Sequence, residues 1–178
     1  MPRIDFRSLT EADLPLLFEW LNRPHVAQWW DGPILYNEVL DRYGAHIRSE
    51  STSPYVVLLD GVPGGYIQSW VAALESEYWW EGVSDPGVLG IDQLLADPGG
   101  LCQGVGTAMV GQFVERRFQD PSVTRIILDT DPENFRAIRC YEKVGFRRVG
   151  VGTTPEGPVL LLTIERERFR APTAASRL

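Results

Sequence analysis

The sequence predicts a single mixed α/β domain, in which a central twisted sheet of mixed strand direction is flanked by about four helices. Its 178 residues, 44% hydrophobic and 23% charged, are enough for one domain with a proper core. The first half alternates short strands with tight turns, which is typical of antiparallel pairing. The second half places a glycine turn and an amphipathic helix between two strands, as in a βαβ unit.

The first half predicts a strand over residues 4–9 and then two helices. Thr10 can cap the first helix, and Leu14, Leu17, Phe18 and Leu21 share one of its faces. Asp60-Gly61 is a turn signal between two strands. We therefore expect helices over 11–21 and 35–48, and strands over 55–59, 65–71 and 88–94.

The second half begins with the clearest helix, residues 104–118, whose apolar side chains recur with a 3.6-residue period. A β-branched strand over 124–128 follows, then a helix over 134–144 that Gly145 can end. Strands over 147–151 and 159–164 enclose a turn at Thr154–Gly157. The whole order is β-α-α-β-β-β-α-β-α-β-β. We expect residues 1–170 to form the domain and 171–178, which lack an apolar period, to be a frayed tail.

Composition restricts the possible functions. The net charge of −7 disfavours nucleic acid and favours a cationic partner. Apolar runs are too short to span a bilayer and the N-terminus lacks a signal pattern, so we expect a cytoplasmic protein that binds no membrane. Cys102 and Cys140 match no metal-ligand spacing, so we expect no metal and two unpaired thiols. No apolar stripe is left over, which favours a monomer.

The glycine turn predicts a phosphate site. Gly104 and Gly106 open the strongest helix, and backbone N–H groups of Gln103, Gly104, Val105, Gly106 and Thr107 could surround a pyrophosphate at the positive end of the helix dipole. The turn is neither a Walker loop nor a dinucleotide fingerprint, because the lysine and the third glycine are missing.

Together with residues 134–146, this turn resembles the acetyl-CoA site of the GCN5-related N-acetyltransferase (GNAT) superfamily. The resemblance implies the GNAT fold, with acetyl-CoA as co-substrate. It also implies that Asn134 and Ala137, in an Asn-x-x-Ala motif, contact the cofactor and that Tyr141 protonates the departing thiolate. The superfamily has arginine or glutamine where this chain has Leu101, so one side-chain ligand is missing. The alternative is that Tyr141 only packs in the core.

The amine side needs a group that holds an ammonium or accepts its proton. Asp92 ends a predicted strand about a dozen residues before the glycine turn, and apolar residues flank it. Its carboxylate would face the place where the acetyl group and the amine meet. The alternative is that Asp92 only caps the following turn.

Further segments resemble one family within the superfamily, the aminoglycoside 6'-N-acetyltransferases, from about residue 6 to 165. The tryptophan pairs and the Gly-Ile-Asp-Gln segment are its most specific parts. The matching segments are Glu19-Trp20-Leu21-Asn22-Arg23, Trp29-Trp30, Trp79-Trp80, Asp85-Pro86-Gly87-Val88, Gly90-Ile91-Asp92-Gln93, residues 136–143 and Thr153-Thr154-Pro155 with Gly157-Pro158.

The family resemblance implies direct transfer from acetyl-CoA to the 6'-amine of kanamycin- or tobramycin-type drugs within a ternary complex, and hence resistance. It implies Asp92 at the reacting amine, Tyr141 as the acid, and a drug pocket that includes Trp29, Glu77, Trp79, Trp80, Asp129 and Glu156. Glu77 and Glu156 stand where the family usually has aspartates. Such a pocket suits a polycation, which needs carboxylates and flat aromatic faces. Trp29 and Trp30 could instead only cover the core.

Three alternatives stay open. Cys102 or Cys140 could carry the acyl group, although neither has a histidine nearby in the sequence. The acceptor could be another amine, such as a polyamine or a protein N-terminus. The chain could also be a sensor that binds acyl-CoA or a drug without turnover.

Overall fold

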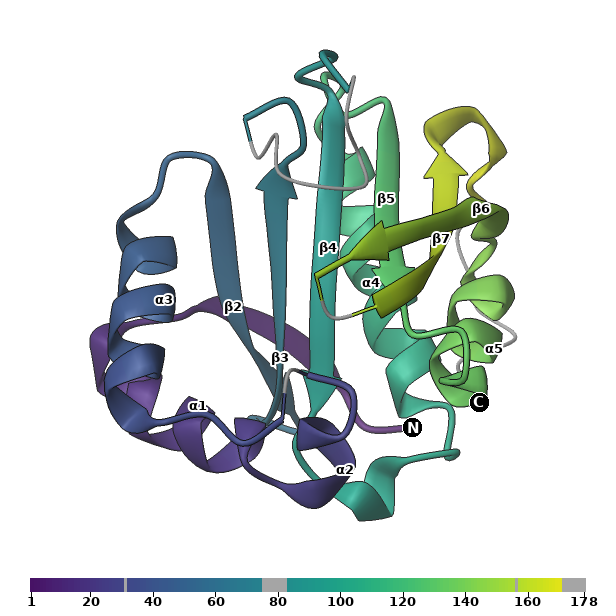
Figure 1. Cartoon of the computed structure of the whole chain (residues 1–178). Coiled ribbons are helices and arrows are strands. Elements are labelled where there is room, and N and C mark those ends of the chain that lie inside the picture. The colour runs from purple at the N-terminus through teal and green to yellow at the C-terminus, as the bar shows by residue number, and fades with distance from the viewer. Residues whose placement is uncertain (31, 75–82, 156, 171–178) are drawn as a thin grey trace.

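The protein was analysed as a computed structural model that describes residues 1–30, 32–74, 83–155 and 157–170. Seven strands form one sheet in the order β1-β2-β3-β4-β5-β7-β6 (Figure 1). Only β4 and β5 are parallel neighbours, and the other adjacent pairs are antiparallel. The expected mixed sheet is therefore confirmed. The strands are β1 (Ile4–Ser8), β2 (Thr52–Leu59), β3 (Val62–Val71), β4 (Val88–Leu95), β5 (Arg125–Thr130), β6 (Arg147–Thr154) and β7 (Gly157–Glu165).

The helices follow the predicted order with one addition, a short helix that the sequence analysis did not predict. This helix, α2 (Pro24–Ala27), has proline at its first position, where the missing N–H costs nothing. The first predicted helix begins as a 3-10 turn (Glu11–Asp13) and continues as α1. The other helices are α1 (Leu14–Leu21), α3 (Tyr36–Arg48), α4 (Val105–Phe118) and α5 (Phe135–Val144). In the described residues no helix is long and apolar enough to cross a membrane.

The sheet separates two apolar cores. Figure 1 shows α4 and α5 together on one face and α1 to α3 near the first strands. The core against α4 and α5 contains Ile91, Phe113 and Tyr141. The core against α1 to α3 contains Trp20, Tyr66 and Leu94. Successive side chains of β4 thus alternate between the two cores, as the pleat of a strand requires.

The parallel pair at the centre of the sheet is short. Within the described part of the chain, β4 pairs with β5 only from Val88–Gly90 to Arg125–Ile127. Beyond this point β4 stays paired with β3 as far as Leu95, and β5 stays paired with β7 as far as Thr130. The two central strands therefore diverge, and the site described below lies where they part.

Arg166 ties the end of α4 to the end of β7. Its guanidinium donates hydrogen bonds to the carbonyl oxygens of Phe118, Asp120 and Val123 and lies 5.2 Å from the centre of the Phe118 ring. The last carbonyls of a helix lack partners within the helix, so a cation there stabilises its end. This contact holds α4, and with it the glycine turn at its other end, against the sheet.

Candidate active site

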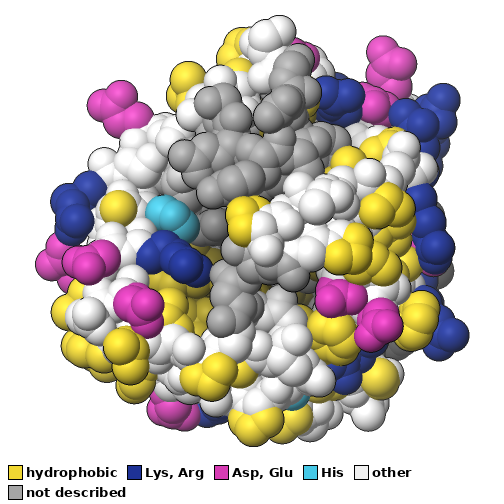
Figure 2. Space-filling view, in the orientation of Figure 1, with side chains coloured by type: hydrophobic (Ala, Val, Ile, Leu, Met, Phe, Trp, Pro, Cys, Tyr) yellow, Lys and Arg dark blue, Asp and Glu magenta, His cyan; other side chains and the backbone are white. Residues whose placement is uncertain are grey.

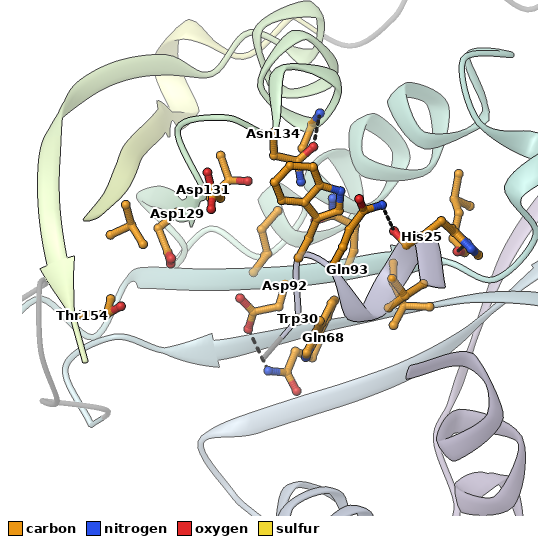
Figure 3. Close-up of a pocket in the computed structure, with 18 of the residues that line it drawn as sticks. His25, Trp30, Gln68, Asp92, Gln93, Asp129, Asp131, Asn134 and Thr154 are labelled. Atoms are coloured by element: carbon orange, nitrogen blue, oxygen red, sulfur yellow. Dashed lines mark hydrogen bonds between the residues drawn. The ribbon is translucent and has the colours of Figure 1, made fainter. Parts of the chain in front are cut away.

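A cavity of about 660 Å³ opens at the divergence of β4 and β5. Its walls come from α2, α3, β3, β4, the end of β5 and the loop after it, α5 and the β6–β7 turn (Figure 3). Of the sequence-predicted residues, it is lined by Trp29, Asp92, Asp129, Asn134, Ala137 and Tyr141. The structure thus brings together residues that are up to 112 positions apart in the chain, counted from Trp29 to Tyr141.

Asp92 is held by two donors from the neighbouring strand. Its Oδ2 accepts hydrogen bonds from Gln68 Nε2 at 2.8 Å and from Trp70 Nε1 at 2.9 Å. Figure 3 shows the Gln68 contact at the floor of the cavity. Both donors reach the same oxygen, so the carboxylate is held in one orientation within the cavity.

Tyr141 lies on the other side of β4, with only 6% of its surface exposed. Burial raises the pKa of its phenol, and a hydrogen bond from Gln93 opposes this in part. Gln93 Nε2 donates to the phenol oxygen at 2.8 Å. The phenol therefore keeps its proton at neutral pH, and because its oxygen is already the acceptor from Gln93, the O–H can be donated elsewhere.

Adjacent residues of β4 place the two groups on opposite sides of the cavity. Asp92 lies opposite Gln68 in the β3–β4 register, on the face that carries Leu94. Gln93 faces the other way, toward Tyr141 and the core of Ile91. β4 can therefore present Asp92 to the amine on one face and, through Gln93, hold Tyr141 near the thiol on the other.

Two carboxylates lie at the end of β5, Asp129 within the strand and Asp131 just after it. Asp131 also lines the cavity, and Figure 3 shows both near each other above Asp92. Asp131 Oδ1 accepts a hydrogen bond from the Glu133 backbone N–H at 2.7 Å. The sequence analysis did not include Asp131, although its two-residue spacing from Asp129 at a strand end was a usable signal. These aspartates give the cavity wall an anionic character that suits ammonium groups.

The glycine turn has the geometry of a phosphate site. Gly104 is the N-cap of α4 in the left-handed conformation, with φ of 81°. The first hydrogen bond of the helix runs from Ala108 N–H to the Gly104 carbonyl oxygen, so the N–H groups before Ala108 precede the helical ladder. A side chain on Gly106 would meet only ordinary contacts, 3.7 Å from Cys140 Sγ on α5. The turn thus adjoins the helix of Tyr141 and fits a pyrophosphate, although residues 103–107 do not line the cavity itself.

Asn134 and Leu101 connect the turn to the cavity. Asn134 is 9% exposed and caps α5, accepting the Ala137 N–H at 3.2 Å on its side-chain oxygen. Leu101 lines the cavity with an apolar side chain.

Gln93 Oε1 is buried and has no hydrogen-bond partner among the described residues. Such an acceptor beside the divergent strands fits a co-substrate that carries amide N–H groups.

Two tryptophans that follow α2, Trp29 and Trp30, form another wall. Trp29 is 36% exposed and Trp30 is half-buried, with its ring 6.3 Å from that of Tyr66 in an edge-on contact. Both line the cavity, so Trp30 contributes to the core and to the wall. Glu77, Trp79, Trp80 and Glu156 lie outside the described residues. Figure 2 shows charges of both signs spread over this face.

Several site residues escaped the sequence analysis. Gln68, Trp70 and Gln93 have no motif of their own, and only the pairing of β3 with β4 and the packing of α5 bring them to Asp92 and Tyr141. The segment Gly90-Ile91-Asp92-Gln93 was singled out, but the separate role of Gln93 was not.

Comparisons with known proteins agree with this geometry. Residues 10–154 match the family model described as acetyltransferase (GNAT) domain. The chain is 46% identical over 170 residues to an aminoglycoside N(6')-acetyltransferase type 1 from Klebsiella pneumoniae, covering 93% of this chain and 85% of the relative. It is 52% identical over 96 residues to a kanamycin resistance protein from Rhizobium radiobacter, covering 54% and 89%. A crystal structure of AAC(6')-Ib with coenzyme A and kanamycin superposes with a TM-score of 0.87 at 46% identity, covering 93% and 96%.

Proposed function

Because this chain belongs to the aminoglycoside N(6')-acetyltransferases of the GNAT superfamily, we propose that it acetylates the 6'-amine of kanamycin-type aminoglycosides with acetyl-CoA and so confers resistance. One observation carries the proposal at the level of residues. Asp92 and Tyr141 face one cavity from opposite sides of β4, at the divergence of the central strands. Acyl transfer from a thioester to an amine requires two groups. One is an anionic site for the amine, and the other is a protonated phenol for the leaving thiolate.

Asp92 serves the amine. Its carboxylate attracts the ammonium form and takes one proton from it, directly or through water, which frees the lone pair for attack on the acetyl carbon. The second proton, which the nitrogen loses once the N–C bond has formed, passes to solvent. The two N–H donors on Oδ2 keep the carboxylate oriented for this. A neutral amide at this position would keep the shape but lose the charge and the proton acceptor.

Tyr141 serves the leaving group. Acetyl-CoA supplies the acetyl group, and its thiol is released when the carbon–sulfur bond breaks. Tyr141 gives its phenol proton to that sulfur, and solvent returns a proton to the phenolate after the product leaves. Direct transfer in a ternary complex needs no cysteine, and burial raises the pKa of the Cys140 thiol, which makes it a poor nucleophile.

The drug pocket we propose combines carboxylates with aromatic faces. Asp129 and Asp131 lie near Asp92 in the cavity wall, and Trp29 borders it. Together with Glu77, Trp79, Trp80 and Glu156, they would receive the several ammonium groups and flat sugar rings of the drug. The proposal includes a monomeric enzyme acting in the cytoplasm, with neither nucleic acid nor a membrane as partner.

Release of free thiol from acetyl-CoA tests this function. We expect turnover with kanamycin A, much less with spermidine, and a loss of at least tenfold in kcat/KM for Asp92→Asn. Higher kcat/KM with spermidine would move the enzyme to polyamines. Measurable acetyl-CoA binding without turnover on any amine would identify a sensor instead.

A further inference from the structure

The indole of Trp70 crosses from β3 onto β4 beside the reacting carboxylate. Trp70 is paired with Gly90 in the strand register, and Gln68 is paired with Asp92. The ring packs against Ala72, Val88 and Ile127. Its N–H reaches two residues further along β4, to Asp92 Oδ2 at 2.9 Å.

Gly90 makes room for this indole. A Cβ at position 90 would lie 2.0 to 2.5 Å from three ring atoms of Trp70, far inside contact distance. Gly90 is absent from the glycines with positive φ, so its backbone conformation does not demand glycine. The need at this position is space, and Trp70 is what fills it.

The second donor on Asp92 is fixed independently. Tyr66 donates its hydroxyl to Gln68 Oε1, so the amide of Gln68 must turn its N–H toward Asp92. Tyr66 is fully buried and Gln68 is 7% exposed. The carboxylate therefore rests on two N–H donors whose own positions are set by packing.

Given the proposed role of Asp92, we propose that Trp70 is a positioning residue for the acetyl transfer, acting through Asp92 and made possible by Gly90. Two donors on one oxygen restrict the rotation of the carboxylate. Without the indole N–H, the carboxylate gains rotational freedom at the point where the amine must be aligned with the acetyl carbon. Small misalignments at this point strongly lower the rate of acetyl transfer.

Trp70→Phe tests the inference, because it keeps an aromatic ring in the packing and removes the N–H. We expect kcat with kanamycin A to fall roughly tenfold, the loss of one hydrogen bond to a charged group. The KM for acetyl-CoA should stay within about twofold, because Trp70 contacts the amine side. Gly90→Ala should lower kcat to a similar extent, and adding Trp70→Phe to it should cause little further loss.

The effect of Trp70→Phe is also measured in the Asp92→Asn variant, and this comparison decides whether Trp70 acts through Asp92. If Trp70 acts through the Asp92 carboxylate, Trp70→Phe has little effect on the residual kcat of Asp92→Asn, measured at pH 9 where more of the amine is neutral. An equal loss in both backgrounds would mean that Trp70 is only structural and would overturn the inference. Trp20→Phe is the matched control, since Trp20 is 3% exposed in α1 and the two donors to Asp92 Oδ2 are Gln68 and Trp70; its kcat should be unchanged.

The wild-type assay separates this inference from the proposed function. No turnover by the wild-type protein with any aminoglycoside would refute the function itself. Wild-type turnover together with an unchanged kcat in Trp70→Phe would refute only the role of Trp70. Circular dichroism melting of each variant identifies any loss of activity that comes from unfolding.

Discussion

Replacing Tyr141 with phenylalanine separates the chemical role of its hydroxyl from its packing. The ring of Tyr141 packs 6.0 Å from that of Phe146, and phenylalanine keeps this contact. Loss of the general acid should lower kcat about 100-fold or more. Loss of the hydroxyl oxygen also leaves the partly buried Gln93 Nε2 without its acceptor, which costs about 1–3 kcal/mol of folding stability. For a protein of this size that lowers the melting temperature by roughly 2–12 °C.

The double variant Gln93→Leu/Tyr141→Phe distinguishes the two effects. Replacing both partners with apolar groups removes the unsatisfied donor, so the melting temperature should recover toward the wild-type value while kcat stays low. Thiol release with saturating kanamycin A and acetyl-CoA measures kcat, and calorimetry measures the melting temperature. A Tyr141→Phe enzyme with near wild-type kcat would refute the assignment of Tyr141 as the acid.

Three further predictions concern the co-substrate, the fold and pH. Gly106→Ala should raise the Kd for coenzyme A about tenfold in calorimetric titration. The variant should keep its stability, because a Cβ there has room against the protein. An unchanged Kd would show that the glycine turn does not bind the phosphates. Arg166→Met should lower the free energy of unfolding in urea by about 1–3 kcal/mol with kcat unchanged. Equal stability would show that the hydrogen bonds from Arg166 to the carbonyl oxygens at the end of α4 do not stabilise the fold. Burial raises the pKa of Tyr43 from 10.0 to about 12, so its stabilising contribution is complete below pH 10 and is lost as pH rises toward 12. Wild type should lose about 1 kcal/mol more than Tyr43→Phe between pH 8 and pH 11 in urea unfolding; equal losses would contradict this.

The order of elements was predictable because apolar period and turn residues are local signals. Asp60 and Gly61 both have positive φ, as a tight hairpin turn requires. Strand β2 nevertheless begins before the predicted residue 55, and it includes Pro54. The Pro54 carbonyl accepts the Leu9 N–H just beyond the last β1–β2 pair, at Ser8 and Tyr55, so the missing donor falls where that ladder ends.

The site was predictable only where a residue has a motif. The glycine turn, Asn134, Tyr141 and Asp92 stand in recognisable segments. The donors to Asp92 depend on the β3–β4 register, and the connection between Val71 and Val88 is too long for that register to be predicted from its sequence. Helix α2 is four residues long, too short to show a helical period.

The most direct test of the central claim compares kanamycin A with a kanamycin that lacks only the 6'-amine. We expect thiol release with kanamycin A and none with the kanamycin that lacks the 6'-amine. The NMR spectrum of the product should show a single acetyl group, on the 6'-nitrogen. Equal turnover with both drugs, or an acetyl group on another nitrogen, would contradict it.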